Sequence, residues 1–204
     1  KAVVLGIRQI RGELDVPHAR ATPVYVRSDR TGDAEAIART RIDGWRQSYK
    51  GLVPQASLDA MSVEASAPLW QRVLAAPGDR ASVFVAEGVA GVVGFAAGNR
   101  LDEPRHGCDA ELTGVYLAHD VQRHGLGRRL VGTVAAERAA HGATAMIAWV
   151  LAGSAPARRF FEALGAELVI EQPFEWDGAP LVEAGYRWLD LPSLVGLAGI
   201  KALH

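Results

Sequence analysis

The chain has 204 residues, of which 49% are hydrophobic, and a formal net charge of −1 at pH 7. This length suffices for one domain with its own core, and the charge provides no basic footprint for nucleic acid or an anionic membrane surface. The single cysteine, Cys108, excludes an internal disulfide framework. No apolar run reaches the 18 residues typical of a membrane-spanning helix, and residues 1–10 are too short for a signal peptide. We therefore expect a cytoplasmic protein.

The apolar pattern predicts strands and helices that alternate along most of the chain. A linker at 17–23 leads into a strand at 24–27 and a helix at 33–49, which Asp33 or Thr31 caps. A second helix at 57–75, interrupted near Pro68, precedes a hairpin of strands at 81–87 and 91–98 and a polar turn at 102–109. Next come a strand at 110–117 and a helix from 126 to a stop at 141–142. A buried strand at 145–151 and a short helix after 154 follow. The closing strands lie at 167–171 and 183–189, around a turn at 178–180. This order predicts an α/β (α+β mixed) fold, a twisted mixed sheet of six to seven strands with helices on both faces.

The junction between the strand at 110–117 and the next helix reads Gln122-Arg123-His124-Gly125-Leu126-Gly127-Arg128. Its two glycines allow a tight turn and a close approach of ligand to backbone. The helix start leaves its first N–H groups unpaired and carries partial positive charge. Together these features predict an anion site suited to a pyrophosphate. The spacing excludes a nucleoside-triphosphate P-loop, and Leu130 stands where a dinucleotide-binding loop has its third glycine.

This Gln-x-x-Gly-x-Gly spacing resembles the acetyl-CoA pyrophosphate loop of the GNAT superfamily of N-acetyltransferases. Residues 154–166 resemble that family's second cofactor segment, and residues 33–54 look like its first helix and acceptor-side loop. The resemblance covers residues 23–190 and implies a GNAT-like N-acetyltransferase domain there, with extensions at 1–22 and 191–204. It also implies that two central parallel strands, ending near Leu117 and Leu151, separate to admit the pantetheine arm. Gly114 independently indicates a bulge or a close backbone approach on the first of these strands.

The resemblance implies acetyl-CoA as cosubstrate. No metal is expected, because His119 and His124 have no cysteine or acidic partner at metal-ligand spacing. Ser154 stands where the family commonly has an asparagine that contacts the pantetheine. The expected cofactor contacts come from the strand end, the glycine loop and the second segment: Val115, Tyr116, Leu117, Gln122, Arg123, His124, Gly125, Leu126, Gly127, Arg128, Ser154, Ala157, Phe160 and Phe161.

For catalysis, the resemblance implies a general base at Glu111. Reference pKa values of about 4.3 for Glu and about 10.4 for a Lys-type amine disfavour direct proton removal, so we expect a water relay or an amine of lowered pKa. Alternatively, Glu111 only pairs with an arginine on a neighbouring strand. Phe161 occupies the family's usual tyrosine position and cannot protonate the leaving thiolate. Either the thiolate leaves unaided or Tyr116 or Tyr49 supplies the proton, the alternative being that both are core or rim aromatics.

The predicted function is N-acetyl transfer from acetyl-CoA to a primary amine by direct attack in a ternary complex, with a small molecule preferred to a protein N-terminus as acceptor. Trp45 and Tyr49 are candidates for the acceptor pocket, capped by Phe174 and Trp176, although aromatic residues at helical spacing also suit a core. The alternative function is a CoA-binding sensor with little turnover. The apolar segments at 2–10 and 194–203 are suited to packing on the domain or on a partner, and we hypothesise that one of them contributes to a homodimer.

Overall fold

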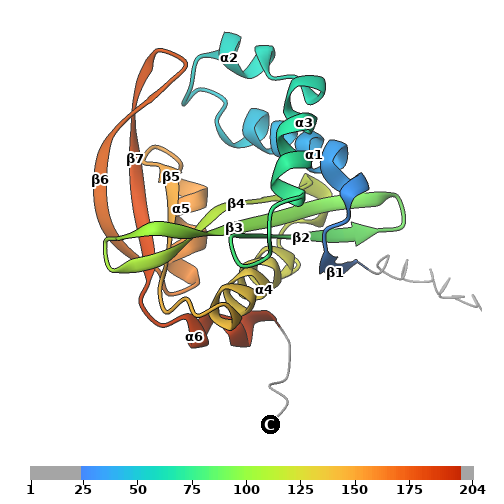
Figure 1. The fold of residues 1–204 in the computed structure, drawn as a ribbon. Coiled ribbons are helices and arrows are strands. Elements are labelled where there is room, and N and C mark those ends of the chain that lie inside the picture. The colour runs from blue at the N-terminus through green and yellow to red at the C-terminus, as the bar shows by residue number, and fades with distance from the viewer. Residues whose placement is uncertain (1–23, 199–204) are drawn as a thin grey trace, which may run out of the picture.

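A seven-stranded sheet organises residues 24–198, the part of the chain that the computed structural model describes (Figure 1). In chain order the strands are β1 (Tyr25–Ser28), β2 (Ala81–Gly88), β3 (Gly91–Arg105), β4 (Cys108–Leu117), β5 (Met146–Leu151), β6 (Glu167–Trp176) and β7 (Ala179–Trp188). Their order across the sheet is β1-β2-β3-β4-β5-β7-β6. The pair β4–β5 is parallel, and the other neighbours are antiparallel. The mixed sheet confirms the predicted fold class.

Helices cover both faces of this sheet, as predicted. They are α1 (Ala34–Ser48), α2 (Gln55–Ala60), α3 (Val63–Leu74), α4 (Leu126–Ala140), α5 (Ala155–Ala163) and α6 (Leu191–Val195). Helices α1 and α3 lie on one side of β2 and β3, while α4 lies on the other (Figure 1). Alternate residues of β2 belong to two different hydrophobic cores, one on each side of the sheet, because successive side chains of a strand point to opposite faces. Val83 and Val85 pack in the cluster of α1, whereas Phe84 and Ala86 pack in that of α4.

The parallel strands β4 and β5 are paired over only three residues each. The pairs are Ala110 with Met146, Glu111 with Ile147, and Leu112 with Ala148. Beyond them, β4 follows β3 as far as Leu117, while β5 follows β7 as far as Leu151. The β3–β4 register shifts so that Ala97 opposes Gly114 and Gly98 opposes Leu112, which leaves Thr113 as an extra residue on β4. Such a bulge bends a strand, so the two strands separate at the predicted place.

Two helices occupy the stretch where the sequence predicts one helix interrupted near Pro68. The interruption lies at residues 61–62, between α2 and α3, and the predicted break near Pro68 is wrong. The hydroxyl of Ser62 accepts a hydrogen bond from the amide of Ala65 (3.2 Å) and thereby starts a new helix. Pro68 lies inside α3 and is exposed, as is Glu64 four residues earlier. The carbonyl that Pro68 cannot bond is therefore on the solvent side, where water replaces the missing donor.

Two hairpins are longer than the sequence suggests, and the predicted polar turn at 102–109 is wrong. Strand β3 continues to Arg105, and only His106 and Gly107 form the turn, with φ of 52° and 79°. Likewise Asp177 and Gly178, with φ of 51° and 75°, join β6 to β7. A turn of two consecutive residues with positive φ matches the right-handed twist of the paired strands. The polar residues before and after such a turn can therefore belong to the two strands of a hairpin. Cys108 is consequently a buried residue of β4 rather than a turn residue, and burial raises the pKa of its thiol.

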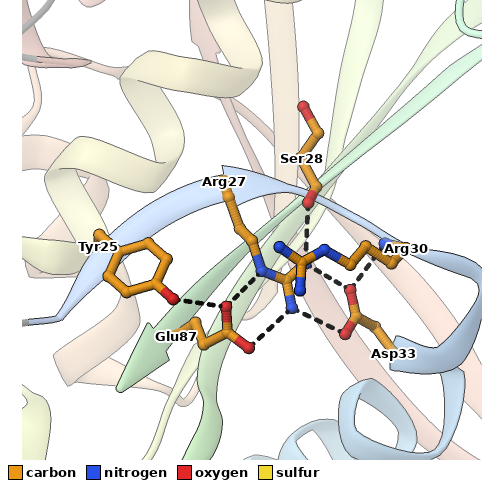
Figure 2. Close-up of polar contacts among 6 residues, drawn as sticks. All are labelled: Tyr25, Arg27, Ser28, Arg30, Asp33 and Glu87. Atoms are coloured by element: carbon orange, nitrogen blue, oxygen red, sulfur yellow. Dashed lines mark hydrogen bonds and ion pairs between the residues drawn. The ribbon is translucent and has the colours of Figure 1, made fainter. Parts of the chain in front are cut away.

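The carboxylate of Asp33 binds arginine instead of capping α1, so neither Asp33 nor Thr31 provides the predicted cap. Figure 2 shows Arg27 on β1 between Asp33 and Glu87, with Nη1 2.7 Å from Asp33 and Nε 2.6 Å from Glu87. Asp33 also accepts a hydrogen bond from the Arg30 amide (2.7 Å). The Arg27 and Asp33 side chains are only 13% and 11% exposed. This cluster fastens the edge strand β1 both to β2 and to the turn that starts α1.

The cluster should make folding stability depend on pH in the acid range. Arg27 lowers the pKa of Asp33 and, through its hydrogen bonds, that of Glu87 to about 2. A carboxylate of lowered pKa stabilises the fold above its unfolded pKa of about 4 and loses this contribution as the pH falls through its folded pKa. Asp33→Asn should therefore lower the Tm by roughly 2–4 °C at pH 7, about 1 kcal/mol, and by progressively less between about pH 5 and pH 2.

Thermal melts of Asp33→Asn and wild type across this pH range test the effect. Glu35→Gln is the matched control, because Glu35 and Arg39 form an ion pair with side chains 68% and 60% exposed. We expect no measurable Tm change for this control. A deficit in Asp33→Asn that is the same at pH 3 as at pH 7 contradicts the proposed charge effect.

The described part of the C-terminal segment packs on its own domain. Helix α6 and the short turn η3 (Gly196–Ala198) lie against α4. Leu191 and Leu194 are buried there, and a Cβ added at Gly132 of α4 would lie 2.5 Å from the Ala198 amide nitrogen. Glycine therefore permits this close approach. The predicted linker at 17–23 and the apolar segment at 2–10 lie outside the described residues. Among residues 24–198, none of the helices combines the length and the apolar character needed to cross a membrane.

Candidate active site

A cleft of about 760 Å³ opens where β4 and β5 separate. Its walls are the last six residues of β4, two residues of β5, the end of α1, the loop before α4, the first turn of α4, and α5. Because α1 and α4 lie on opposite faces of the sheet, the cleft reaches through the gap between the strands. A ligand held on the α4 side is thus accessible to a second ligand on the α1 side.

The loop before α4 presents unpaired amides to this cleft. Arg123 and Gly125 have φ of 66° and 81°, and α4 begins at Leu126. The amide of Arg129, which donates to the Gly125 carbonyl (3.0 Å), is the first in α4 with a backbone acceptor. Within residues 24–198, the amides of residues 123–128 have no intramolecular acceptor. Gly125 has no atom within 4 Å of the position of an added Cβ, so this surface is open. Free amides at a helix start fit a diphosphate.

The exposed edge of β4 also presents backbone groups to the cleft. The Ala118 amide donates to Val93 on β3 (2.8 Å), so by strand alternation the amides of Val115 and Leu117 point away from β3. They face the side from which β5 has separated. The Gln122 side chain donates to the Leu117 carbonyl (3.0 Å), which fastens the loop to the end of β4. The edge therefore offers hydrogen-bond donors to an extended ligand arm.

Close packing joins the first turn of α4 to α5. A Cβ at Gly127 would lie 3.3 Å from the Phe160 ring and 3.4 Å from the Leu117 side chain. Phe161 follows as a buried residue whose ring lies 5.5 Å from that of Trp188 and 6.2 Å from that of Tyr186, measured between centroids. Phe161 also lines the cleft. At this position the chain presents a hydrocarbon surface and no proton donor.

The Tyr116 ring packs closely against the backbones of two glycines. A Cβ at Gly44 of α1 would lie 2.6 Å from its ring, and one at Gly114 of β4 would lie 2.9 Å away. The Tyr116 hydroxyl accepts a hydrogen bond from Trp45 Nε1 (2.8 Å). Burial raises the pKa of Tyr116. Burial and the neighbouring Tyr116 hydroxyl also raise the pKa of Tyr49. Both phenols are therefore weaker acids than an exposed tyrosine.

Glu111 lies in the paired part of β4, one residue before the strands separate, and it does not line the cleft itself. Its neighbours across the sheet are Asn99 on β3 and Ile147 on β5. Burial raises the pKa of Glu111, Arg105 opposes this shift, and the charge of Glu183 adds to it. Within residues 24–198, Glu111 forms no ion pair with an arginine, so the alternative of a direct contact does not apply there.

The predicted acceptor aromatics form a packed cluster beside the cleft. The Trp45 ring lies 4.8 Å from that of Tyr49 and 5.0 Å from that of Trp176. Their neighbours come from the connection after α1 and from the end of the β6–β7 hairpin, which includes Phe174. The hairpin end rises beside α2 (Figure 1), where the Ser57 hydroxyl donates to Asp177. Tyr49 lines the cleft, and Trp45 does not.

Most predicted cofactor residues lie together in this cleft. The exceptions are His124 and Leu126, which do not line it. Sequence reasoning missed Gln47, Ser48 and Arg159, and it treated His119 as an ordinary loop residue, although all four line the cleft. The side chains of Gln47 and His119 are hydrogen-bonded to each other (2.7 Å). The sequence did contain a signal for Arg159. This residue stands three positions after Pro156 and directly before Phe160, so the three share one face of the short helix.

The charged residues at the cleft are basic, namely Arg123, Arg128 and Arg159, with His119 at the start of the loop. In residues 24–198, no three or more His, Cys, Asp or Glu side chains are grouped in a way that could hold a metal ion. The cleft thus combines free amides and guanidinium groups, which are ligands for phosphate rather than for a cation.

The sequence matches the model of the acetyltransferase (GNAT) family over residues 45–166. It is also similar to the uncharacterized N-acetyltransferase YuaI of Bacillus subtilis (strain 168). The two sequences are 34% identical over 173 residues, which cover 84% of this chain and 96% of YuaI.

Solved structures share the fold at lower sequence identity. The PaiA N-acetyltransferase of Thermoplasma acidophilum, solved in complex with coenzyme A, has a TM-score of 0.65 and 14% identity, covering 81% of this chain and 99% of that one. YncA of Salmonella typhimurium, solved with acetyl-CoA, has a TM-score of 0.60 and 19% identity, covering 81% of this chain and 93% of that one.

Proposed function

This chain belongs to the GNAT acetyltransferase family, and from that premise we propose that it transfers an acetyl group from acetyl-CoA to a primary amine of a small molecule. The observation that carries the proposal is the row of free amides at residues 123–128, beside the point where β4 and β5 separate. PaiA and YncA, which share the fold, are bound to coenzyme A and acetyl-CoA. These observations support the same ligand class for this chain.

Each wall of the cleft has a distinct task in this proposal. Acetyl-CoA supplies the acetyl group as a thioester. The amides of residues 123–128, with Arg123 and Arg128, bind the diphosphate. The outward-facing amides of Val115 and Leu117 hold the pantetheine arm and polarise the thioester carbonyl. Ser154, Ala157, Phe160 and Phe161 line the cleft next to the first turn of α4.

On the acceptor side, we assign the role of general base to Glu111. Since Glu111 lies outside the cleft lining, a water molecule would relay the proton from the amine. Tyr49 and Trp45 form the rim next to Tyr116. The β6–β7 hairpin contacts α2 beside this rim, including through the Ser57–Asp177 hydrogen bond. We infer that an acceptor side bordered by these elements favours a small amine over a folded protein.

A second candidate function is a CoA-binding sensor with little turnover. The observation that favours it is Phe161, which lines the cleft in a buried position and cannot protonate a leaving thiolate. A thiol pKa of about 8.5 permits departure as thiolate, so the enzyme remains the first candidate.

Thermal melting with acetyl-CoA tests the proposed ligand. At a concentration of 100 times Kd, ligand binding should add about 2.7 kcal/mol to the free energy of unfolding, which raises the Tm of a chain of this length by roughly 5–10 °C. The absence of any shift contradicts the proposed function. A shift accompanied by thiol release that depends on an added amine supports the enzyme. A shift without amine-dependent thiol release across a panel of small amines supports the sensor.

A further inference from the structure

Arginines from two separate elements line the cleft. Arg123 and Arg128 belong to the loop and the first turn of α4, whereas Arg159 belongs to α5. All three are exposed and line the cleft. In the described part of the chain, none of them forms an ion pair with a carboxylate. Their charges are therefore available to an anionic ligand.

The packing of α5 fixes Arg159 beside the loop. Pro156, Arg159 and Phe160 are spaced at i, i+3 and i+4, so they share one face of α5. Phe160 packs on Gly127 in the first turn of α4, where an added Cβ would lie 3.3 Å from its ring. The neighbouring Arg159 therefore reaches the same cleft from α5, next to the first turn of α4, rather than from the loop that carries the free amides.

We propose that Arg159 recognises the 3′-phosphate of coenzyme A and thereby selects the 3′-phosphorylated nucleotide, an inference that rests on the proposed function. The diphosphate already has the amides of residues 123–128 and the two arginines attached to the same loop and turn. The 3′-phosphate is a separate monoester that carries close to two negative charges at pH 7. A cation separate from those at the diphosphate would favour it, and Arg159 is the lining arginine that comes from a different element, α5. A planar guanidinium suits a phosphate through paired hydrogen bonds.

Calorimetric titration with coenzyme A and with 3′-dephospho-coenzyme A tests this assignment. Wild type should bind coenzyme A roughly five- to tenfold more tightly, as one charge-assisted contact at an exposed position predicts. Arg159→Ala should bind both nucleotides with the affinity that wild type has for the dephospho form. Arg159→Lys should keep part of the preference, and added salt should reduce the wild-type preference.

Two neighbouring arginines provide matched controls. Arg129 is exposed and adjacent to Arg128 but does not line the cleft, so Arg129→Ala should keep the wild-type preference. Arg128→Ala should weaken the binding of both nucleotides by a similar factor, because we assign the Arg128 side chain to the diphosphate. If Arg159→Ala keeps the wild-type preference, or if Arg128→Ala removes it, the assignment to Arg159 is wrong.

The two nucleotides also separate this inference from the proposed function. Wild type that binds both with equal affinity overturns the role of Arg159 but leaves the proposed function in place. Wild type that binds neither overturns the proposed function and the inference with it. The circular-dichroism melts of Arg159→Ala and Arg129→Ala should coincide with that of wild type, because both side chains are exposed.

Discussion

Replacing Gly125 by alanine should lower the affinity for acetyl-CoA about 100-fold while lowering the free energy of unfolding by only about 1–2 kcal/mol. Gly125 has a φ of 81°, a conformation that L-residues rarely adopt. Its Cα faces open space in the cleft lining, so an added methyl group meets no protein atom within 4 Å. The methyl group would instead occupy the surface at which the amides of residues 123–128 meet the diphosphate. The substitution should therefore reduce the affinity for acetyl-CoA more than it reduces the stability of the fold.

Gly165 offers a control with the same backbone conformation. Its φ is also 81°, it has no atom within 4 Å of an added Cβ, and it follows α5 outside the cleft lining. Gly165→Ala should lose a similar amount of stability and keep the wild-type affinity for acetyl-CoA. Urea unfolding gives the first quantity and calorimetric titration the second. Equal losses of affinity in both variants, or normal affinity in Gly125→Ala, exclude the loop as the diphosphate site.

The cofactor side of the cleft could be predicted because its determinants are local in sequence. A strand, two glycines and the start of a helix dictate unpaired amides whatever surrounds them. The expected bulge near Gly114 rests on a similarly local argument, since a glycine inside a strand favours an irregular backbone. The residues missed on this side, such as Arg159, lie within a segment that was already assigned to the cofactor.

The acceptor side could not be predicted in the same way, because tertiary contacts bring its residues together. Gln47 lies on α1 and His119 after β4, and no sequence pattern relates the two positions. Trp45 and Tyr49 have a spacing that suits a binding pocket and a packed core equally, and the position of the β6–β7 hairpin makes Trp45 part of a packed cluster. Asp33 shows the same limit. A local cap was the expectation, but Arg27, which lies on β1 and also binds Glu87 of β2, donates to the Asp33 carboxylate instead.

Replacing Glu111 by glutamine should lower kcat at neutral pH by about 100-fold, the lower end of what a general base contributes. In wild type, only ionised Glu111 accepts a proton, so the rate should fall as the pH drops through its pKa. Burial raises that pKa above the usual value near 4.3, so the acid limb of the pH–rate profile, where the rate falls, should move to higher pH. Glu111→Gln should lack the limb. Steady-state rates at saturating acetyl-CoA, measured from pH 5 to pH 9, test this expectation.

The neighbours of Glu111 provide controls that move the limb without removing the base. Glu183→Gln deletes a negative charge that raises the pKa of Glu111, so the limb should shift to lower pH. Arg105→Gln deletes a charge that lowers this pKa, so the limb should shift to higher pH. Because an ionised buried carboxylate opposes folding, Glu111→Gln should melt at or above the wild-type temperature at pH 7. A folded Glu111→Gln variant with the wild-type pH profile, or limbs that stay fixed in both neighbour variants, excludes Glu111 as the base and assigns the proton to solvent.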